Sequence, residues 1–148
     1  MSDLKQRIND DVKSAMRNKE KEQLVVLRLI LAAIKQIEVD QRIELDDEQI
    51  IAVLDKLAKQ HRDSISQYDD AGRQDLADKE RFELDIVQHY LPTALSDEEL
   101  GVLIQQAIED TGAESMKDMG KVMGILKSKA QGRADMGKVS AEVKAKLA

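Results

Sequence analysis

The sequence predicts an all-α protein composed of two helical subdomains. Apolar residues recur every three or four positions along most of the chain, which is the period of an α-helix. Aromatic residues make up only 2% of the 148 residues, so the core must consist of Leu, Ile, Val, Ala and Met, a set that favours helices over sheets. No segment of any length alternates apolar and polar residues as a half-buried strand would.

The first two helices are expected before residue 45. The first carries a single apolar stripe, and Asn18 is expected to end it. That stripe comprises Leu4, Ile8, Val12 and Ala15. The second helix covers Leu24–Ile37 and is apolar on nearly every side. We therefore expect it to lie centrally, with other helices packed against several of its sides.

Two further helices are expected to complete the N-terminal half. Asp46 followed by Gln49 is a capping pair at the start of the third helix, and the Asp69–Gly72 cluster separates this helix from the fourth. Pro92 biases Leu91 away from the helical conformation, which ends the fourth helix. The apolar stripe of the third helix is Ile50, Leu54, Leu57, His61, Ile65 and Tyr68. The fourth helix carries Leu76, Phe82, Leu84, Val87 and Leu91.

A clear helix start follows the proline. Ser96–Glu99 has the pattern of a capping box, and Leu95 and Leu100 take the positions of the hydrophobic staple that accompanies it. Composition, the sign of the charge and glycine usage all change across this short joint. We therefore place the boundary here, with residues 1–91 as the longer N-terminal subdomain and residues 96–148 as the C-terminal subdomain.

Three helices are expected in the C-terminal subdomain. The first begins at Asp97 and ends near Thr111–Gly112, where glycine is typical of a helix end. The second covers about 116–129 and is broken by Gly132. Asp135 is placed to cap the third. This half is therefore expected to be a three-helix unit.

The composition narrows the class of protein. Cysteine is absent, which removes disulfides, thiolate nucleophiles and cysteine-based zinc sites. This absence and the lack of a secretory pattern in the first residues favour a cytosolic location. The longest apolar run, Leu24–Ile34, contains Arg28 and is shorter than the ~20 residues that a membrane span needs. We therefore expect no membrane partner.

The net charge of −6 is unevenly distributed. Residues 116–148 contain eight basic and three acidic residues, a net charge of +5, which leaves −11 for the first 115 residues. A basic end on an acidic body can steer a polyanion to that end and repel it from the other.

No catalytic motif and no cofactor site is recognisable. Gly132–Lys138 has the spacing of a phosphate-binding loop, but Val139 replaces the Ser or Thr that would hold magnesium, and a helix rather than a strand precedes it. Asp85 and His89 lie four residues apart and could share a metal ion, but no third ligand is nearby in sequence. His61 falls on an apolar stripe and is interpreted as a packing residue. We therefore predict no metal site and no catalytic residue.

Gly120 and Gly124 are unusual because each glycine inside a helix costs about 1 kcal/mol relative to alanine. One explanation is a neighbouring helix that packs closely against the bare backbone. The other is the backbone of a nucleic acid that approaches these glycines and Gly132, with basic side chains neutralising its phosphates. The basic side chains are Lys117, Lys121, Lys127, Lys129, Arg133 and Lys138. A third interpretation of these lysines is a solubilising surface.

Several segments together resemble the GatB/YqeY family, and specifically its stand-alone YqeY type. They are residues 83–86, 90–92, 95–100, 118–124 and 132–135, together with the opening from Leu4 to Leu29. The Met119–Gly124 segment, Met-Gly-Lys-Val-Met-Gly, is the most specific of them. Ala94 and Gln131 stand where longer polar or basic residues are expected.

The resemblance implies a helical N-terminal part followed by a three-helix part similar to the tail of the GatB subunit of the tRNA-dependent amidotransferase. In that enzyme the tail helps to hold the misacylated tRNA, and other domains and subunits carry out the glutamine-dependent carbon-nitrogen ligase chemistry. The resemblance therefore implies a module without that catalytic activity on its own.

Three functional hypotheses follow. The first is a non-catalytic module that binds tRNA or another structured RNA through its C-terminal helices. No aromatic residue follows Tyr90, so such binding would read the shape and backbone of a folded RNA rather than stack on single-stranded bases. The second is an adaptor that docks on a larger enzyme through the N-terminal helices, and the third is an amidotransferase-associated activity.

Overall fold

The computed structural model describes residues 2–148 and folds them into seven α-helices, with no β-strand in that range. The prediction of an all-α fold is therefore confirmed. Contacts between Cα atoms divide the chain into two compact units, one that ends at Leu91 and one from Pro92 to Ala148. Each unit has its own hydrophobic cluster.

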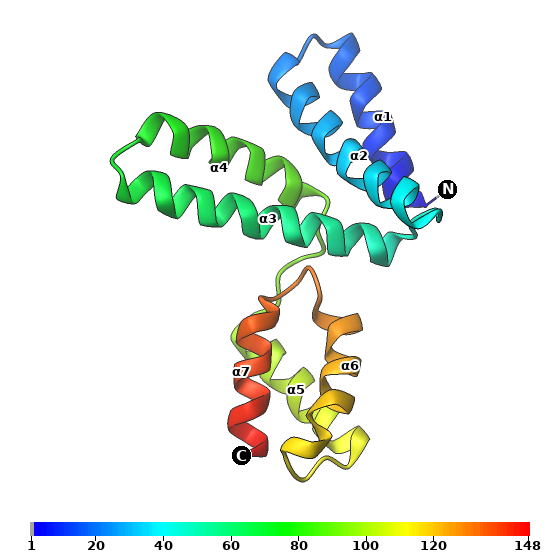
Figure 1. Cartoon of the computed structure of the whole chain (residues 1–148), viewed down its shortest axis with the longest axis vertical. Coiled ribbons are helices and arrows are strands. Elements are labelled where there is room, and N and C mark those ends of the chain that lie inside the picture. The colour runs from blue at the N-terminus through cyan, green and yellow to red at the C-terminus, as the bar shows by residue number, and fades with distance from the viewer. Residues whose placement is uncertain (1) are drawn as a thin grey trace. The chain divides into compact units, whose positions relative to one another are not determined.

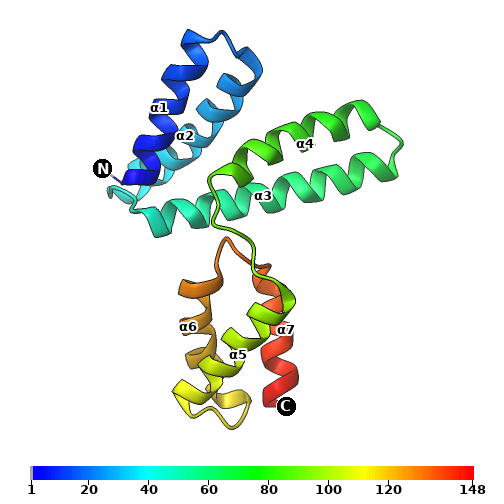
Figure 2. The same ribbon diagram turned by 180° about the vertical axis from the view of Figure 1, so that it is seen from behind.

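Two helical hairpins form the N-terminal unit. The helices are α1 (Asp3–Arg17), α2 (Lys21–Gln41), α3 (Asp47–Asp70) and α4 (Gln74–His89). Helix α1 lies beside α2, and α3 lies beside α4, as two opposite views show (Figure 1, Figure 2).

The helix ends of this unit follow from the local sequence. The Asp46 side chain accepts a hydrogen bond from the Gln49 backbone, and the Gln49 side chain accepts one from the Asp46 backbone, so the predicted capping pair is confirmed. Gly72 turns the chain between α3 and α4 with φ of +71°, a conformation that favours glycine. Helix α4 ends at His89, shortly before Pro92.

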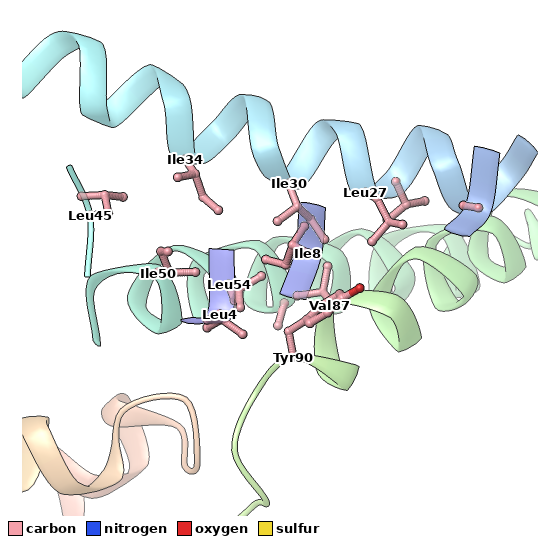
Figure 3. Packing of buried hydrophobic residues seen from close by; sticks show 13 residues of the cluster. Leu4, Ile8, Leu27, Ile30, Ile34, Leu45, Ile50, Leu54, Val87 and Tyr90 are labelled. Atoms are coloured by element: carbon pink, nitrogen blue, oxygen red, sulfur yellow. The ribbon is translucent and has the colours of Figure 1, made fainter. Parts of the chain in front are cut away.

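Aliphatic side chains from all four helices meet in the core of this unit (Figure 3). Ile8, Ile34 and Leu54 are fully buried and come from α1, α2 and α3 respectively, and Val87 of α4 is 1% exposed. Burial of one such side chain contributes roughly 1.5–3 kcal/mol. The core therefore supplies the main force that holds the two hairpins together.

Tyr90 fixes the end of α4 to α1. Its ring is buried and its hydroxyl donates a hydrogen bond to the Asp11 carboxylate. The Arg7 guanidinium lies 5.0 Å from the centre of the ring and donates to the carbonyl of His89 at 3.2 Å. Burial of the phenol and its hydrogen bond to Asp11 raise the pKa of Tyr90, so its hydroxyl remains a donor.

Helix α2 is less enclosed than its sequence suggested. It contacts α1, α3 and α4 on one side, while Val25, Leu29 and Val39 on the other side are 57%, 58% and 62% exposed. The sequence predicted packing on several sides of α2, and three helices do contact it, but they cover only part of its circumference. Phe82, one of the apolar residues that the sequence placed on α4, is also exposed.

The C-terminal unit contains three α-helices around a second core. They are α5 (Asp97–Thr111), α6 (Met119–Ala130) and α7 (Met136–Leu147), with a short 3-10 helix η1 (Met116–Asp118) before α6. Ile104, Leu126 and Val143 are fully buried and represent the three helices in this core. The predicted capping box of Ser96 and Glu99 is present at the start of α5.

The second helix of this unit begins later than expected. The sequence predicted one helix from about residue 116, but residues 116–118 form η1 and the α-helix starts at Met119. The hydroxyl of Ser115 accepts a hydrogen bond from the Lys117 backbone and so caps η1. A 3-10 turn at a helix start is common, because it satisfies backbone groups that the α-helix leaves free.

Candidate nucleic-acid interface

Helix α6 has a buried face and a bare face. Val122, Leu126 and Ala130 are fully buried against α5 and α7. Gly120 and Gly124 lie on the other side, and a Cβ atom added at either position would meet nothing within 4 Å. No helix of the described chain therefore packs closely against these glycines, and the first explanation for them does not hold.

Lysines border the two glycines. Because each residue advances about 100° around an α-helix, residues seven apart lie within about 20° of one another. Lys127 therefore lies above Gly120 on the surface of α6, and Ser128 lies above Lys121. Gly124 lies between these two pairs around the helix axis. We call these five residues the glycine face of α6. All five are exposed.

The lysines of the glycine face form no ion pair with the described part of the chain. The side-chain amines of Lys121 and Lys127 form no ion pair with any residue in the range 2–148, and the same holds for Lys117 and Lys129. Unpaired cations on an exposed surface are available to an external anion. These four lysines are therefore the cations of the predicted set that an anion can reach without first breaking an ion pair or a hydrogen bond.

Two other members of the predicted set serve to hold the C-terminal unit together. Arg133 is half-buried, and its Nε donates a hydrogen bond to the carbonyl of Thr93 at 2.9 Å. The Lys138 Nζ lies 2.6 Å from a carboxylate oxygen of Asp97 at the start of α5. This hydrogen bond raises the pKa of Lys138 and lowers the pKa of Asp97. Both cations thus attach the α6–α7 region to the segment that begins α5.

The six predicted cations therefore do not form one continuous face. Lys117 lies in η1, before the glycine face begins. Lys129 lies about 80° around α6 from Lys121, further from the glycines. Gly132, predicted as a third position of close approach, is in the turn after α6 with φ of +80°. Its glycine is required by that turn, where a side chain would be strained. Sequence reasoning missed the engagement of Arg133 and Lys138 because their partners lie about 40 residues away along the chain.

The N-terminal unit offers a different kind of surface. A groove of about 570 Å³ runs between α2 and α3 and is lined in part by Ala33, Ile37, Val53 and Leu57. Its polar lining is mostly glutamine, such as Gln36 and Gln60, and Lys56 is the one charged residue among those that line it. The groove is therefore suited to an apolar segment of a protein rather than to a polyanion. In the part of the chain that the structure describes, no helix has both the length and the apolar character needed to cross a membrane.

The chain is similar to several fungal proteins that share one name. It is 33% identical over 131 residues to altered inheritance of mitochondria protein 41, mitochondrial, of Pyrenophora tritici-repentis, covering 86% of this chain and 71% of that protein. The proteins of the same name from Vanderwaltozyma polyspora and Eremothecium gossypii are 32% and 36% identical. Those matches cover 76% and 62% of this chain, and 64% and 52% of the relatives. The chain thus spans between about half and seven tenths of these relatives.

The names of these relatives correct the expected location. Each of the three is named a mitochondrial protein, so the cytosolic location inferred from composition was wrong. The inference failed because a lack of cysteine is compatible with more than one compartment and does not identify the cytosol.

The family comparison covers almost the whole molecule. The model of the Yqey-like protein family matches residues 5–147, which includes helices α2–α7 and all of α1 except its first two residues. Both units, and the glycine face with them, therefore fall within the match. This protein belongs to the YqeY-like family.

Proposed function

We propose that this protein binds a folded RNA, with tRNA as the first candidate, through the glycine face of α6. One observation carries the proposal: two glycines on an open helix face are bordered by Lys121 and Lys127, which form no ion pair with any side chain of residues 2–148. A bare helix backbone lets a phosphate chain approach closely, and the lysines neutralise it. The resemblance to the GatB tail selects tRNA as the RNA to test.

The charge distribution supports the same proposal. The net charge of +5 on residues 116–148 favours approach of a polyanion to this end of the sequence, and the acidic remainder disfavours binding elsewhere. No aromatic residue is present after Tyr90, so the binding is expected to depend on the shape and backbone of the RNA.

A salt titration of tRNA binding tests the proposal. Affinity should fall steeply with salt, because each neutralised phosphate releases counterions. The double variant K121Q/K127Q should bind more weakly and reduce the slope of log affinity against log salt by roughly 2, about 1 for each lost phosphate contact. The matched control is K144Q/K146Q, which removes the same charge from α7 and should change the slope much less. Equal effects of the two variants, or no binding by the unmodified chain at low salt, would contradict the proposal.

A second candidate function is an adaptor that docks on a protein through the N-terminal unit. The exposed apolar ridge of Val25, Leu29 and Val39 on α2, together with the groove between α2 and α3, favours it. Capture of partners before and after nuclease treatment separates the two functions. An adaptor keeps its partner after nuclease and loses it on L29E, whereas an RNA-dependent association disappears with the RNA.

A further inference from the structure

Three metal-binding side chains come together between α3 and α4, a place at which the sequence predicted no site. His61 comes from α3, and Glu80 and Glu83 come from one side of α4, three residues apart. The His61 Nδ1 lies 2.6 Å from a carboxylate oxygen of Glu80 and 3.7 Å from one of Glu83. One ligand atom from each residue lies within 4.8 Å of the other two. Among residues 2–148, this is the one group of three or more such side chains.

We propose that His61, Glu80 and Glu83 bind a divalent transition-metal ion, with Zn²⁺ as the first candidate. Imidazole nitrogen and carboxylate oxygen are ordinary zinc ligands, with bonds of about 2.0–2.2 Å. Such bond lengths place neighbouring ligand atoms roughly 3 to 3.5 Å apart. Glu83 is already near this separation from His61, and Glu80 reaches it by a small outward rotation of its side chain. Three protein ligands leave a fourth position for water.

The balance of charge supports a cation at this place. The three side chains are 18%, 21% and 14% exposed, so their carboxylates are partly removed from water. No Lys or Arg forms an ion pair with Glu80 or Glu83 within the part of the chain that the structure describes. Among the described residues, the His61 imidazole is the one basic group paired with the two carboxylates, hydrogen-bonded to Glu80 and 3.7 Å from Glu83, so two acidic side chains share a single partner. A divalent ion would compensate both.

The backbone that carries the ligands is closely packed. Ala58 precedes His61 by three residues, Ala77 precedes Glu80 by three, and both alanines are completely buried. Helices α3 and α4 lie side by side along this stretch in both views (Figure 1, Figure 2). Ligands on two packed helices are held more precisely than ligands on loops. Among residues 2–148, no third side chain of this kind joins the pair Asp85 and His89 that the sequence suggested.

The chain contains only two histidines, which makes the test direct. We would treat the full-length protein with EDTA, titrate it with Zn²⁺ near neutral pH by calorimetry, and follow the two imidazole rings by NMR. One equivalent of Zn²⁺ is expected to bind and to move the ring signals of His61 but not those of His89. H61Q and H89Q assign the two sets of signals, and H89Q is the matched control that should retain binding.

The variant E83Q provides the decisive comparison, because it keeps the size of the side chain. It should weaken Zn²⁺ binding at least about tenfold, since loss of an outer-shell partner alone costs that much. Without metal, E83Q should melt at or above the temperature of the unmodified protein, because it removes a repulsion between carboxylates. With Zn²⁺ present, E83Q should melt at a lower temperature than the unmodified protein. Unchanged affinity in E83Q, equal shifts of both histidines, or no stoichiometric binding by the unmodified chain would overturn the proposal.

Discussion

Glu38 connects three segments of the N-terminal unit through a single carboxylate. Its Oε1 lies 2.8 Å from the Nζ of Lys5 on α1, and its Oε2 accepts a hydrogen bond from the backbone of Leu45, just before α3. The hydrogen bond from Lys5, followed by that from Leu45, lowers the pKa of Glu38 below its ordinary value of 4.5. The charged form of this residue is therefore the form that the folded state prefers.

This preference predicts a stability that depends on pH. Because the pKa of Glu38 is lower in the folded state, its contribution is fully present above pH 4.5 and is lost as the pH falls through the lowered pKa. E38Q should therefore be less stable than the unmodified protein at neutral pH and should lose less stability on acidification. Urea unfolding at a series of pH values measures both effects.

The matched control for this prediction is D63N, which removes an exposed carboxylate of α3. D63N should follow the unmodified protein across the acidic range. If E38Q and the unmodified protein lost stability in parallel below pH 4.5, the assigned role of Glu38 would be wrong.

At the scale of the element, α6 combines low helix propensity with an open face. Gly120 and Gly124 weaken this helix, and nothing in its own unit packs against them to compensate. A face kept bare for RNA would exchange stability for function at these positions. Stability and RNA binding are therefore expected to respond in opposite directions at these positions.

The variant G124A tests that expectation. The added methyl group meets nothing within 4 Å, so the variant should be more stable by about 1 kcal/mol, measured by urea unfolding. If the RNA backbone approaches this face closely, the same methyl group should weaken tRNA binding. G101A is the matched control, because Gly101 in α5 also has open space around it. It should gain similar stability and leave RNA affinity unchanged. Unchanged affinity in G124A would remove the glycines, though not the lysines, from the proposed interface.

At the scale of the whole molecule, stability is divided between two hydrophobic clusters. One is built from residues of α1–α4 and of the segments that flank them, including Leu45 and Tyr90, and the other is centred on α5, α6 and α7, with no buried residue in common. Each unit therefore has a core able to support its own fold. Local unfolding is expected to follow this division.

Hydrogen exchange with core variants tests this division. L126A removes a fully buried side chain of α6 and should destabilise its unit by about 2–5 kcal/mol. Amide exchange should then accelerate throughout α5–α7 and remain unchanged in α1–α4. L54A, at a fully buried position of α3, is the counterpart and should show the converse pattern. Acceleration in both units by either variant would show that they unfold as one.

The sequence alone determined the helices and most of their ends. Helix caps are local, because each one acts on backbone groups within four residues. The short-range sequence pattern therefore predicts the capping pairs at Asp46 and Ser96 and the terminal glycine at position 112. Helical periodicity likewise identified most buried residues, although it did not reveal that one side of α2 and Phe82 are exposed. Periodicity shows which residues are apolar but not how many neighbours a helix has.

Only the tertiary structure decided which polar side chains are free and which are engaged. Lys138 and Arg133 are held by partners about 40 residues away, while Lys121 and Lys127 are not. His61 meets Glu80 and Glu83 because α3 and α4 pack with one particular rotation about their axes. Such side-chain contacts depend on how whole helices pack against one another. That packing is set by the sum of many side-chain contacts rather than by any local sequence pattern.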